Sequence, residues 1–534
     1  MKNIYDRLQS LKKQRVYLFG AGDCGLYARH MLEERFKVAV SGFIDSFRHG
    51  TLDGLPIILA KEFLAENASD RTVLITSQYW REIEETLRSH GHVNHDLLIH
   101  APMSWRNLNQ FRAKLAPVVP ARDMETHPLA TVPNAGAAQA AAPVSAPDAL
   151  TELLTIPFNG ECHVDLPLTE RCNLRCGYCP HHDTSRKSWN ETAPWLVDRV
   201  HALLTAHPGV RIELGGGAGE TTILKTWQQH AERFMATGSQ MRMTTNLARE
   251  LRWDEAETLS RFFHLSVSLD SVDSQILKSI RVGASPSKIV FNIAQIRAAA
   301  AVEGREPPNF NIQAVVTDKS VALVDRVAAM AVALGIKNVR YIALNGRMYD
   351  PTLSGIAGLD RNRALEAVAA FERAFEIGIN ADISVDVDDE VSNCLAACLS
   401  QPTSSEEVAT PVGIPDVPAP QGKIPADGCP PGTTRLCLEP WTHVIFTYDG
   451  TVFSCCYGAP MFRPDYAAIG TDMDAIFNAE PIRDLRRQLL TGDLGALCRN
   501  CVQKPVVAIG EFQEKVDTLV RVRRLRRGIE RPDR

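Results

Sequence analysis

The chain has 534 residues, of which 45% are hydrophobic, and 58 Lys and Arg against 63 Asp and Glu give a net charge of -5. This length predicts several packed domains, because a domain typically spans about 150 residues. The charge excludes a general attraction to nucleic acid or anionic lipid, and no apolar run approaches the roughly 20 residues of a membrane helix. We therefore expect neither a membrane nor nucleic acid among its partners.

The sequence pattern of residues 1–115 predicts that they form a separate domain. The segment RVYLFGAGDCGLYARHML places an apolar strand before Gly20, Gly22 and Gly25, and a helical pattern follows. Glycines at this G-x-G-x-x-G spacing permit a tight turn and let a phosphate approach the helix N-terminus, as in the Rossmann fold. A second strand ends at Asp45, where an acidic side chain would hold a ribose hydroxyl. These four residues are our hypothesis for a nucleotide site, with a protein-protein scaffold as the alternative.

With the segment FIDSFRHGTLDGLPII, this domain also resembles the Rossmann-like domains attached to sugar-modifying enzymes. They include the nucleotide-sugar domain that precedes some acetyltransferase modules. The resemblance implies a three-layer domain that binds a nucleotide or a nucleotide sugar. Residues 116–155 follow, and their Ala and Pro content predicts a low-complexity linker.

The middle of the chain contains a cysteine triplet, Cys172, Cys176 and Cys179, in the string ERCNLRCGYCPH. Three thiolates on one tight loop can bind three irons of a 4Fe-4S cube and leave the fourth iron open to another ligand. A zinc knuckle is the alternative, but zinc usually takes four protein ligands in paired units. The spacing therefore favours an iron-sulfur site with one open iron.

The C-x3-C-x2-C spacing resembles the signature of the radical S-adenosylmethionine (SAM) superfamily. The resemblance implies that SAM binds the open iron and that the reduced cluster cleaves SAM to methionine and a 5'-deoxyadenosyl radical. It also implies a SAM-binding role for the glycine-rich segment ELGGGAGET, although Thr221 stands where many members have proline. The SAM positions that the resemblance implies are Tyr178, Gly217, Gly219, Glu220, Asn246, Ser268, Asp270 and Arg281.

Strand patterns alternate with helix-period stretches around these motifs, which predicts parallel βα units. The predicted strands cover residues 163–168, 210–216, 241–246, 264–270, 310–317 and 339–345. The resemblance implies a partial (β/α)6 barrel of TIM type over residues 156–350. Barrel sites lie at the C-terminal ends of the strands, where we expect the cluster and SAM.

A second cysteine set lies in the C-terminal third. Between Cys437 and Cys455 the pattern HVIFTYDGTVFSC predicts a hairpin with its turn at Asp449-Gly450. With Cys498 and Cys501, four thiolates from separate segments would close a second 4Fe-4S cube, and zinc is the alternative. The arrangement resembles the Twitch form of the SPASM domain, which follows the barrel in part of the superfamily. The resemblance implies a single auxiliary cluster within residues 351–510.

The other cysteines receive simpler interpretations. Cys456 is expected to be a bystander, because strand neighbours point to opposite faces, although an exchange with Cys455 stays open. Cys394 and Cys398 have a helical spacing, and free cysteines behave as small hydrophobes, an interpretation that extends to Cys24, Cys162 and Cys429. Clusters need reduced thiols, which predicts a cytoplasmic protein. The basic tail, residues 511–534, is interpreted as a solvated terminus, with nucleic-acid or membrane contact as the alternative.

The cysteine patterns predict two 4Fe-4S clusters, and the resemblance implies an enzyme that uses SAM and a flavodoxin- or ferredoxin-type electron donor. We expect a small-molecule substrate, a sugar, nucleotide sugar or cyclitol, because of the N-terminal domain and the single auxiliary cluster. Modification of a peptide or protein is the first alternative. An iron-sulfur scaffold or redox carrier is the second, and the SAM positions argue against it because a carrier needs no cosubstrate. No catalytic acid or base is assigned.

Overall fold

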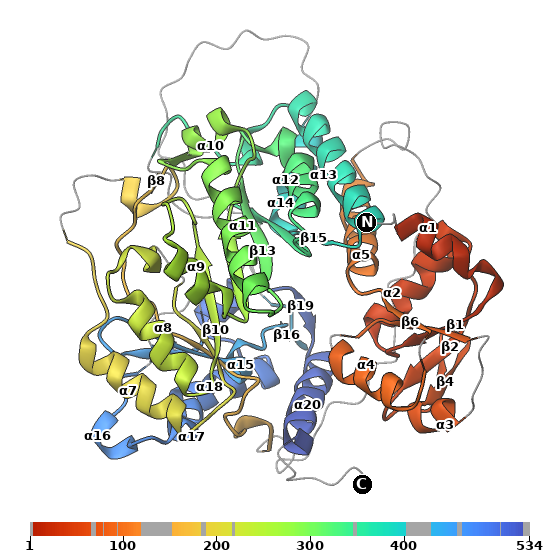
Figure 1. Ribbon diagram of the computed structural model, residues 1–534, viewed down its shortest axis with the longest axis horizontal. Helices are drawn as coiled ribbons and strands as arrows, with labels where there is room; N and C mark the ends of the chain where they lie inside the picture. Colours follow the sequence, from red (N-terminus) through yellow and green to blue (C-terminus); the bar gives the residue numbers. More distant parts are fainter. Residues whose placement is uncertain are drawn as a thin grey trace. The chain divides into compact units, whose positions relative to one another are not determined.

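The computed structural model describes residues 4–65, 71–77, 79–92, 94–118, 152–182, 188–215, 219–344, 350–401, 429–455, 462–501 and 504–526. The chain forms two compact units, each made of segments that are distant in sequence (Figure 1). The first unit comprises residues 1–132, 268–280 and 309–409, and the second comprises 133–267, 281–308 and 410–534. Gly217, Cys456 and the tail beyond residue 526 lie outside the described residues. None of the helices described is long and apolar enough to cross a membrane.

The N-terminal residues of the first unit form a six-stranded sheet in the order β3-β4-β2-β1-β5-β6. Its pairings are parallel except that of β3 with β4. Strands β1 and β5 are almost continuously apolar because they are buried on both faces. The strands are β1 (Arg15–Phe19), β2 (Val40–Asp45), β3 (Gly50–Leu52), β4 (Leu55–Leu59), β5 (Arg71–Ile75) and β6 (His95–Leu97). The helices are α1 (Ile4–Gln9), α2 (Asp23–Met31), α3 (Ala60–Ala65), α4 (Trp80–Ser89) and α5 (His100–Leu115).

The same unit contains three further parallel strands in the order β15-β14-β13. Long apolar stretches between them form helices, and the fully buried Tyr341 of β14 lies edge-on to Phe371 of α13. The strands are β13 (Asn309–Val316), β14 (Asn338–Ala343) and β15 (Ser384–Val387), and the helices are α10 (Ser274–Ile280), α12 (Val324–Ala333), α13 (Arg361–Ala381) and α14 (Asp389–Leu399).

Helix α5 joins the N-terminal sheet to these strands. The ring of Phe111 lies 5.5 Å from that of Phe371 and 5.6 Å from that of Phe375, both on α13. The Ser104 hydroxyl donates to the Ile383 carbonyl and accepts from the Val385 amide, both at 2.8 Å. The N-terminal domain is thus packed onto the barrel strands of its own unit, a contact that the sequence did not predict.

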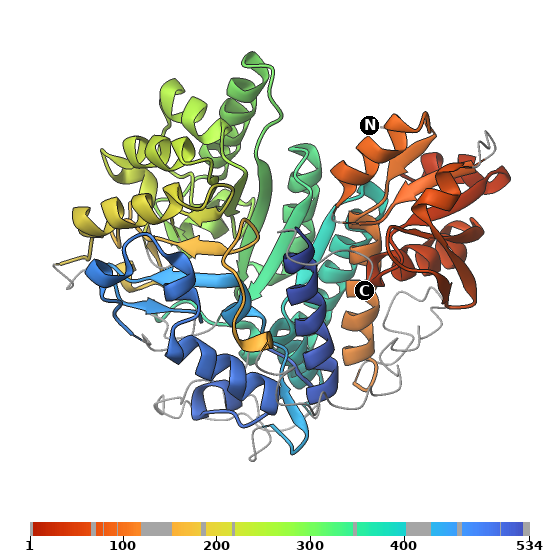
Figure 2. The same ribbon diagram turned by 90° about the horizontal axis from the view of Figure 1, so that it is seen from below.

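The second unit contains four parallel strands that continue into a C-terminal hairpin, in the order β11-β10-β9-β7-β17-β18. Figure 2 shows the light-blue hairpin beside these strands, where β17 pairs in parallel with β7. The strands are β7 (His163–Asp165), β9 (Arg211–Glu213), β10 (Gln240–Thr245), β11 (His264–Ser268), β17 (His443–Phe446) and β18 (Val452–Phe453). Each of the six predicted barrel strands is therefore present, and the parallel sheets confirm the predicted α/β class.

The predicted hairpin is also confirmed, since β18 is antiparallel to β17 and Gly450 takes the positive φ (+87°) of its turn. Two shorter pairs complete the unit, β8 (Arg175–Cys176) with β12 (Arg281–Val282) and β16 (Thr433–Arg435) with β19 (Val506–Ala508). Its helices are α7 (Pro194–Thr205), α8 (Trp227–Ala236), α9 (Trp253–Ser260), α11 (Pro286–Val302), α15 (Glu439–Thr442), α16 (Tyr466–Ile469), α17 (Met473–Phe477), α18 (Glu480–Thr491), α19 (Ala496–Arg499) and α20 (Ile509–Arg526).

Candidate active site

The cysteine triplet lies on a loop that is held by a short strand pair. Arg281 of β12 stands opposite Cys176 of β8, and the two strands are antiparallel. Cys176 is buried, whereas Cys172 and Cys179 are half-buried. The Cys179 amide donates to the Cys176 carbonyl at 2.9 Å, which tightens the turn between these two ligand candidates. The three thiols therefore lie on one compact loop with part of their surface open.

Arg281 places its guanidinium among these thiols. It is only 8% exposed, and its Nη1 atom lies 3.9 Å from the Cys176 sulfur. The same guanidinium lies over the ring of Tyr178, 5.4 Å from its centroid. Two of the predicted SAM positions thus contact one another and the cysteine loop. A buried cation here favours anionic sulfur and can meet a carboxylate.

The backbone of Glu220 is hydrogen-bonded to the residue that precedes Cys172. Its amide donates to the Arg171 carbonyl at 2.7 Å. A Cβ on Gly219 would lie 1.8 Å from the Thr169 carbonyl oxygen, so glycine is required at this close approach. Glu220 is 1% exposed. The segment that carries Glu220 is therefore packed against the residues that lead into Cys172.

The Glu220 carboxylate also contacts the end of strand β10. It accepts hydrogen bonds from the Thr245 hydroxyl at 2.9 Å and from the Asn246 amide at 2.7 Å. The Asn246 side chain in turn lies 3.6 Å from the Cys172 sulfur and donates to Asn173 at 3.0 Å. Glu220 and Asn246, predicted from separate motifs, therefore lie together beside the cysteine loop.

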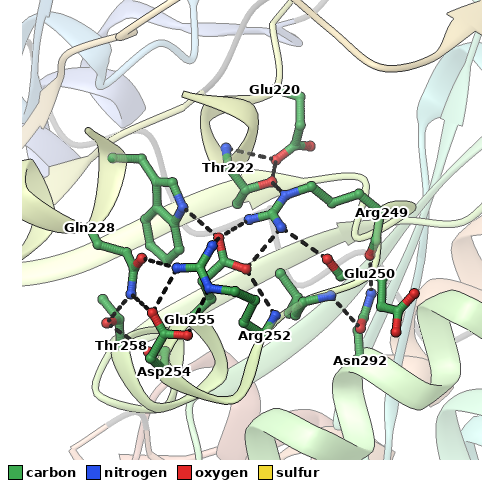
Figure 3. Close-up of polar contacts among 12 residues, drawn as sticks. Glu220, Thr222, Gln228, Arg249, Glu250, Arg252, Asp254, Glu255, Thr258 and Asn292 are labelled. Atoms are coloured by element: carbon green, nitrogen blue, oxygen red, sulfur yellow. Dashed lines mark hydrogen bonds and ion pairs between the residues drawn. The ribbon is translucent and has the colours of Figure 1, made fainter. Parts of the chain in front are cut away.

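A polar network holds the chain that follows Asn246 (Figure 3). Asn292, fully buried on α11, donates to the carbonyls of Leu247 at 2.9 Å and Arg249 at 2.6 Å. Arg249 then pairs with the buried Glu255, and its Nε lies 3.4 Å from the Thr222 hydroxyl, which donates to Glu220. Burial alone would raise the pKa of Glu255, but its hydrogen bonds to Arg249 hold that pKa below its usual value. The network makes the loop between β10 and α9 rigid.

The surroundings of Cys172 disfavour the ionised form of its thiol unless a cation binds to it. Burial raises its pKa to about 12, with smaller contributions from Glu220, Cys176 and Cys179. A thiolate therefore forms here only when a metal centre replaces the proton. In the described residues no group of three or more His, Cys, Asp or Glu is arranged around a single metal ion. A cube binds one thiolate on each iron, so its ligands need not converge on one point.

Two of the predicted SAM positions, Ser268 and Asp270, fall in the first unit. Asp270 is buried, and its carboxylate accepts a hydrogen bond from the Val315 amide of β13 at 2.9 Å. The amide of Leu269 between them donates to the Gln313 carbonyl at 2.9 Å. Asp270 therefore fixes the backbone of β13, whatever further partner it has.

The second cysteine set also comes together. Burial raises the pKa of Cys437 to about 12, and Cys455 is close enough to raise it further. Burial raises the pKa of Cys498 to about 11, with contributions from Cys455, Cys501 and Cys429. Cys455 therefore lies within electrostatic range of both Cys437 and Cys498. Cys429, which the sequence analysis treated as a lone hydrophobe, lies beside them.

Arg435 organises the loop that carries Cys498 and Cys501. This arginine, 8% exposed at the end of β16, donates to the carbonyls of Cys498 at 3.2 Å, Arg499 at 2.8 Å and Lys504 at 3.0 Å. Three carbonyls around one guanidinium fix the loop, because the planar fork matches several acceptors at once. Sequence analysis missed Arg435, since nothing in its local pattern separates it from a surface arginine.

The glycine turn of the N-terminal domain follows β1. Gly20 has a φ of +131°, and a Cβ on Gly25 would lie 1.9 Å from the Gly20 carbonyl oxygen, so both are required by close packing. Gly22 caps α2 and faces open space. Asp45 accepts the amides of Phe47 at 2.9 Å and Arg48 at 3.0 Å, which closes its own turn. Of these four residues, Gly22 offers the clearest approach for a ligand.

Two protein-family models match the sequence. Residues 166–301 match the radical SAM superfamily, and residues 437–502 match the SPASM iron-sulfur cluster-binding domain. The chain therefore contains a radical SAM domain and, after it, a SPASM domain. The two matches cover the cysteine triplet with its SAM positions and the complete second cysteine set.

Solved structures that resemble this radical SAM protein have low sequence identity to it. Streptococcus suis SuiB bound to S-adenosylmethionine is 14% identical over 77% of this chain and 79% of its own, with a TM-score of 0.42. Native anSMEcpe with bound AdoMet and Cp18Cys peptide is 16% identical over 69% and 97%, at 0.39. BtrN in complex with AdoMet and 2-DOIA is 13% identical over 65% and 94%, at 0.31. No curated protein matches the sequence.

The radical SAM domain makes the protein an enzyme and implies a 4Fe-4S cluster and SAM, while the SPASM domain suggests further iron-sulfur clusters. When bound, the cluster and SAM supply reductive cleavage of SAM. The residues present fit that role. Cys172, Cys176 and Cys179 would hold the cluster, and the buried Arg281 lies beside Cys176. Glu220 would orient the SAM amino group while it holds the end of β10.

The remaining cysteines are buried or half-buried and lie outside the two predicted cluster sites. Cys398 is buried on α14, and its thiol donates to the Ile356 carbonyl at 3.3 Å. Cys162 is fully buried, 3.6 Å from a guanidinium nitrogen of the buried Arg523. Burial raises the pKa of Cys24 and of Cys394 to about 11. These thiols therefore stay protonated near neutral pH.

Proposed function

We propose that this radical SAM enzyme abstracts a hydrogen atom from a sugar, nucleotide sugar or cyclitol, using the 5'-deoxyadenosyl radical that SAM cleavage supplies. The observation that carries the proposal is the N-terminal parallel sheet, in which a glycine turn leads from β1 into α2 and Gly22 faces open space. Such a turn suits the phosphates of a nucleotide sugar. The fixed contact of α5 with α13 and β15 keeps this domain with the barrel strands of its unit.

We further propose a single closed auxiliary cluster held by Cys437, Cys455, Cys498 and Cys501, which corresponds to the Twitch form. Four thiolates saturate a cube, so this cluster would pass electrons without binding substrate. The location would be the cytoplasm, where thiols stay reduced, and the electron donor a flavodoxin or ferredoxin. Peptide modification is the competing function, since SPASM domains also occur in enzymes that modify peptides.

Deuterium transfer distinguishes the two substrate classes. The anaerobically reconstituted full-length enzyme would be reduced with dithionite and supplied with SAM and perdeuterated myo-inositol, glucose or UDP-glucose, or with deuterated peptides. We expect deuterium in 5'-deoxyadenosine, detected by mass spectrometry, only with a sugar or cyclitol. Deuterium from peptides alone would reject the proposal.

The N-terminal site is tested by direct binding to the intact protein. Asp45→Ala should weaken UDP-glucose binding by about 0.5–1.5 kcal/mol, the net value of one hydrogen bond. Calorimetry on the full chain measures this effect, with the exposed Glu62→Gln as the control. If the wild-type protein binds no nucleotide or nucleotide sugar, the domain is a scaffold.

A further inference from the structure

A row of polar side chains crosses the sheet of the second unit, away from the predicted SAM positions. Asp165 of β7, Glu213 of β9, Arg242 of β10 and His264 of β11 are successive partners in the parallel register. Partners in a parallel sheet present their side chains to the same face, because both strands alternate with a period of two. These four residues are called the polar row below.

The two faces of this sheet differ sharply. The residues that alternate with the polar row are apolar and fully buried or nearly so, and helix α8 packs against β10. They are Val164, Ile212, Met241, Met243, Leu265 and Val267. On the other face, the Glu213 side chain keeps 14% of its surface exposed and that of Arg242 keeps 27%. The polar row is therefore on the accessible face of the sheet.

Strand β10 connects the polar row to the predicted SAM site. Asn246, beside Cys172, comes four residues after Arg242, which is about 13 Å along a strand. Thr244 and Ser266 form the register pair between them. Ser266 is 4% exposed, and its hydroxyl has no hydrogen-bond partner among the described residues. A buried hydroxyl without a partner costs stability, so its presence on this face points to a ligand that satisfies it.

The two carboxyl groups of the polar row both have pKa values that are raised toward neutral pH. Burial raises the pKa of Asp165 to about 6. Burial and then the charge of Asp165 raise the pKa of Glu213 to about 7, although Arg242 lies 3.6 Å away and opposes this rise. A structural ion pair would instead hold both pKa values low. One carboxyl can therefore donate a hydrogen bond while the other accepts one, which matches a hydroxyl group.

Two imidazoles on this face, those of His264 and His163, have lowered pKa values. Burial and Arg242 lower the pKa of His264 to about 4. Burial and then His443 lower the pKa of His163 to about 2, and these two rings are stacked with centroids 4.7 Å apart. The row therefore offers hydrogen-bond donors and acceptors on several neighbouring side chains, which suits the hydroxyl groups of a ligand.

We propose that the polar row and Ser266 bind the hydroxyl groups of the molecule from which hydrogen is removed, a polyol such as a sugar or a cyclitol. This inference rests on the proposed function and deepens it. It assigns the substrate to the face of β7, β9, β10 and β11, and the N-terminal glycine turn to a different ligand or a different part of the substrate.

The test uses the full-length reconstituted enzyme and the polyol from the panel above that stimulates SAM cleavage most. Ser266→Ala and Glu213→Gln should each raise the polyol concentration for half-maximal stimulation at least 10-fold, with an unchanged dissociation constant for SAM. Glu232→Gln on the exposed face of α8 is the matched control and should behave as wild type.

Thermal unfolding separates binding from folding. The pKa of Glu213 is raised in the folded protein, so its ionisation destabilises the fold as the pH rises from about 4 to about 7. Glu213→Gln should therefore melt at a higher temperature than wild type at pH 8 and at the same temperature below pH 4. Ser266→Ala should melt no lower than wild type, since its hydroxyl has no described protein partner.

The outcomes distinguish this inference from the proposed function. If a polyol stimulates the wild type, but the two variants need no more of it, the inference is wrong and the proposed function stands. The same holds if Glu213→Gln melts lower at pH 8, because the carboxylate then has a structural role. If peptides and no polyol stimulate the wild type, the proposed function fails and the inference fails with it.

Discussion

The two cysteine sites of the second unit are assembled in different ways. In the first, Cys172, Cys176 and Cys179 share one loop, and side chains such as Asn246 lie against the sulfurs. In the second, the four cysteines come from three separate segments, and Arg435 binds three carbonyls of the loop that carries two of them. The ligands of the first site are close in sequence, and side chains from other segments contact them. The second site depends on a buried arginine that hydrogen-bonds to a loop distant from it in sequence.

The largest expected effect is loss of SAM cleavage from the first site. Cys176→Ala leaves only two thiolates to hold the cluster. We therefore expect the rate of SAM cleavage to fall by more than about 100-fold, which exceeds the loss usual for mutation of residues that only support the ligands. Production of 5'-deoxyadenosine with dithionite measures this loss, and Cys394→Ala is the control. Undiminished 5'-deoxyadenosine from Cys176→Ala would reject the first site.

The second site should persist when the first is removed, and it should depend on Arg435. With Cys172, Cys176 and Cys179 all changed to Ala, we expect about four irons per chain after reconstitution. Adding Arg435→Ala should remove them, because the loop loses three hydrogen bonds to a charged donor, at about 1.5–3 kcal/mol each.

Iron, sulfide and zinc analysis measures this dependence, together with the electron paramagnetic resonance signal of the reduced cluster. Arg435→Lys should rescue it only in part, since an ammonium lacks the planar fork. Arg487→Ala, on the exposed face of α18, is the control. Zinc in place of iron, or four irons retained without Arg435, would show that the comparison between the two sites is wrong.

A smaller effect is expected at Glu220, which belongs to the first site but is not a thiol ligand. Glu220→Gln removes a charged acceptor worth about 1.5–3 kcal/mol, so SAM should bind about 10- to 150-fold more weakly. Equilibrium dialysis of the reconstituted protein measures this change. Glu257→Gln, at a half-buried position of α9, serves as the control. Equal SAM affinity in the two variants would show that Glu220 does not bind SAM.

The smallest effect is expected at Cys429, which lies beside the second site but exceeds the four ligands of a closed cube. Cys429→Ser should keep the auxiliary irons and shift the spectrum of the cluster only slightly. Iron content and the paramagnetic resonance signal measure this. A loss of iron as large as that from Cys498→Ser would show that Cys429 is a ligand. The proposed set of four auxiliary-cluster ligands would then be wrong.

The sequence alone predicted much of the fold, because parallel strands and helices have their own periods. All six barrel strands, the hairpin at Gly450 and the glycine turn after β1 were predicted within a few residues. The packing of α5 on α13 was not predicted. Nothing in the local pattern of α5 says which distant surface its apolar face covers.

The same division holds for the chemistry. By itself the sequence determined the cysteine loop, Glu220, Asn246 and Arg281, since a cluster and SAM impose fixed spacings on a short stretch of chain. Only the tertiary structure decided that Asn246 lies against Cys172, that Arg435 secures the second cysteine loop, and that Asp165 and Glu213 meet across adjacent strands. These contacts join residues far apart in the chain, so their energies depend on burial and register, which the order of residues does not reveal.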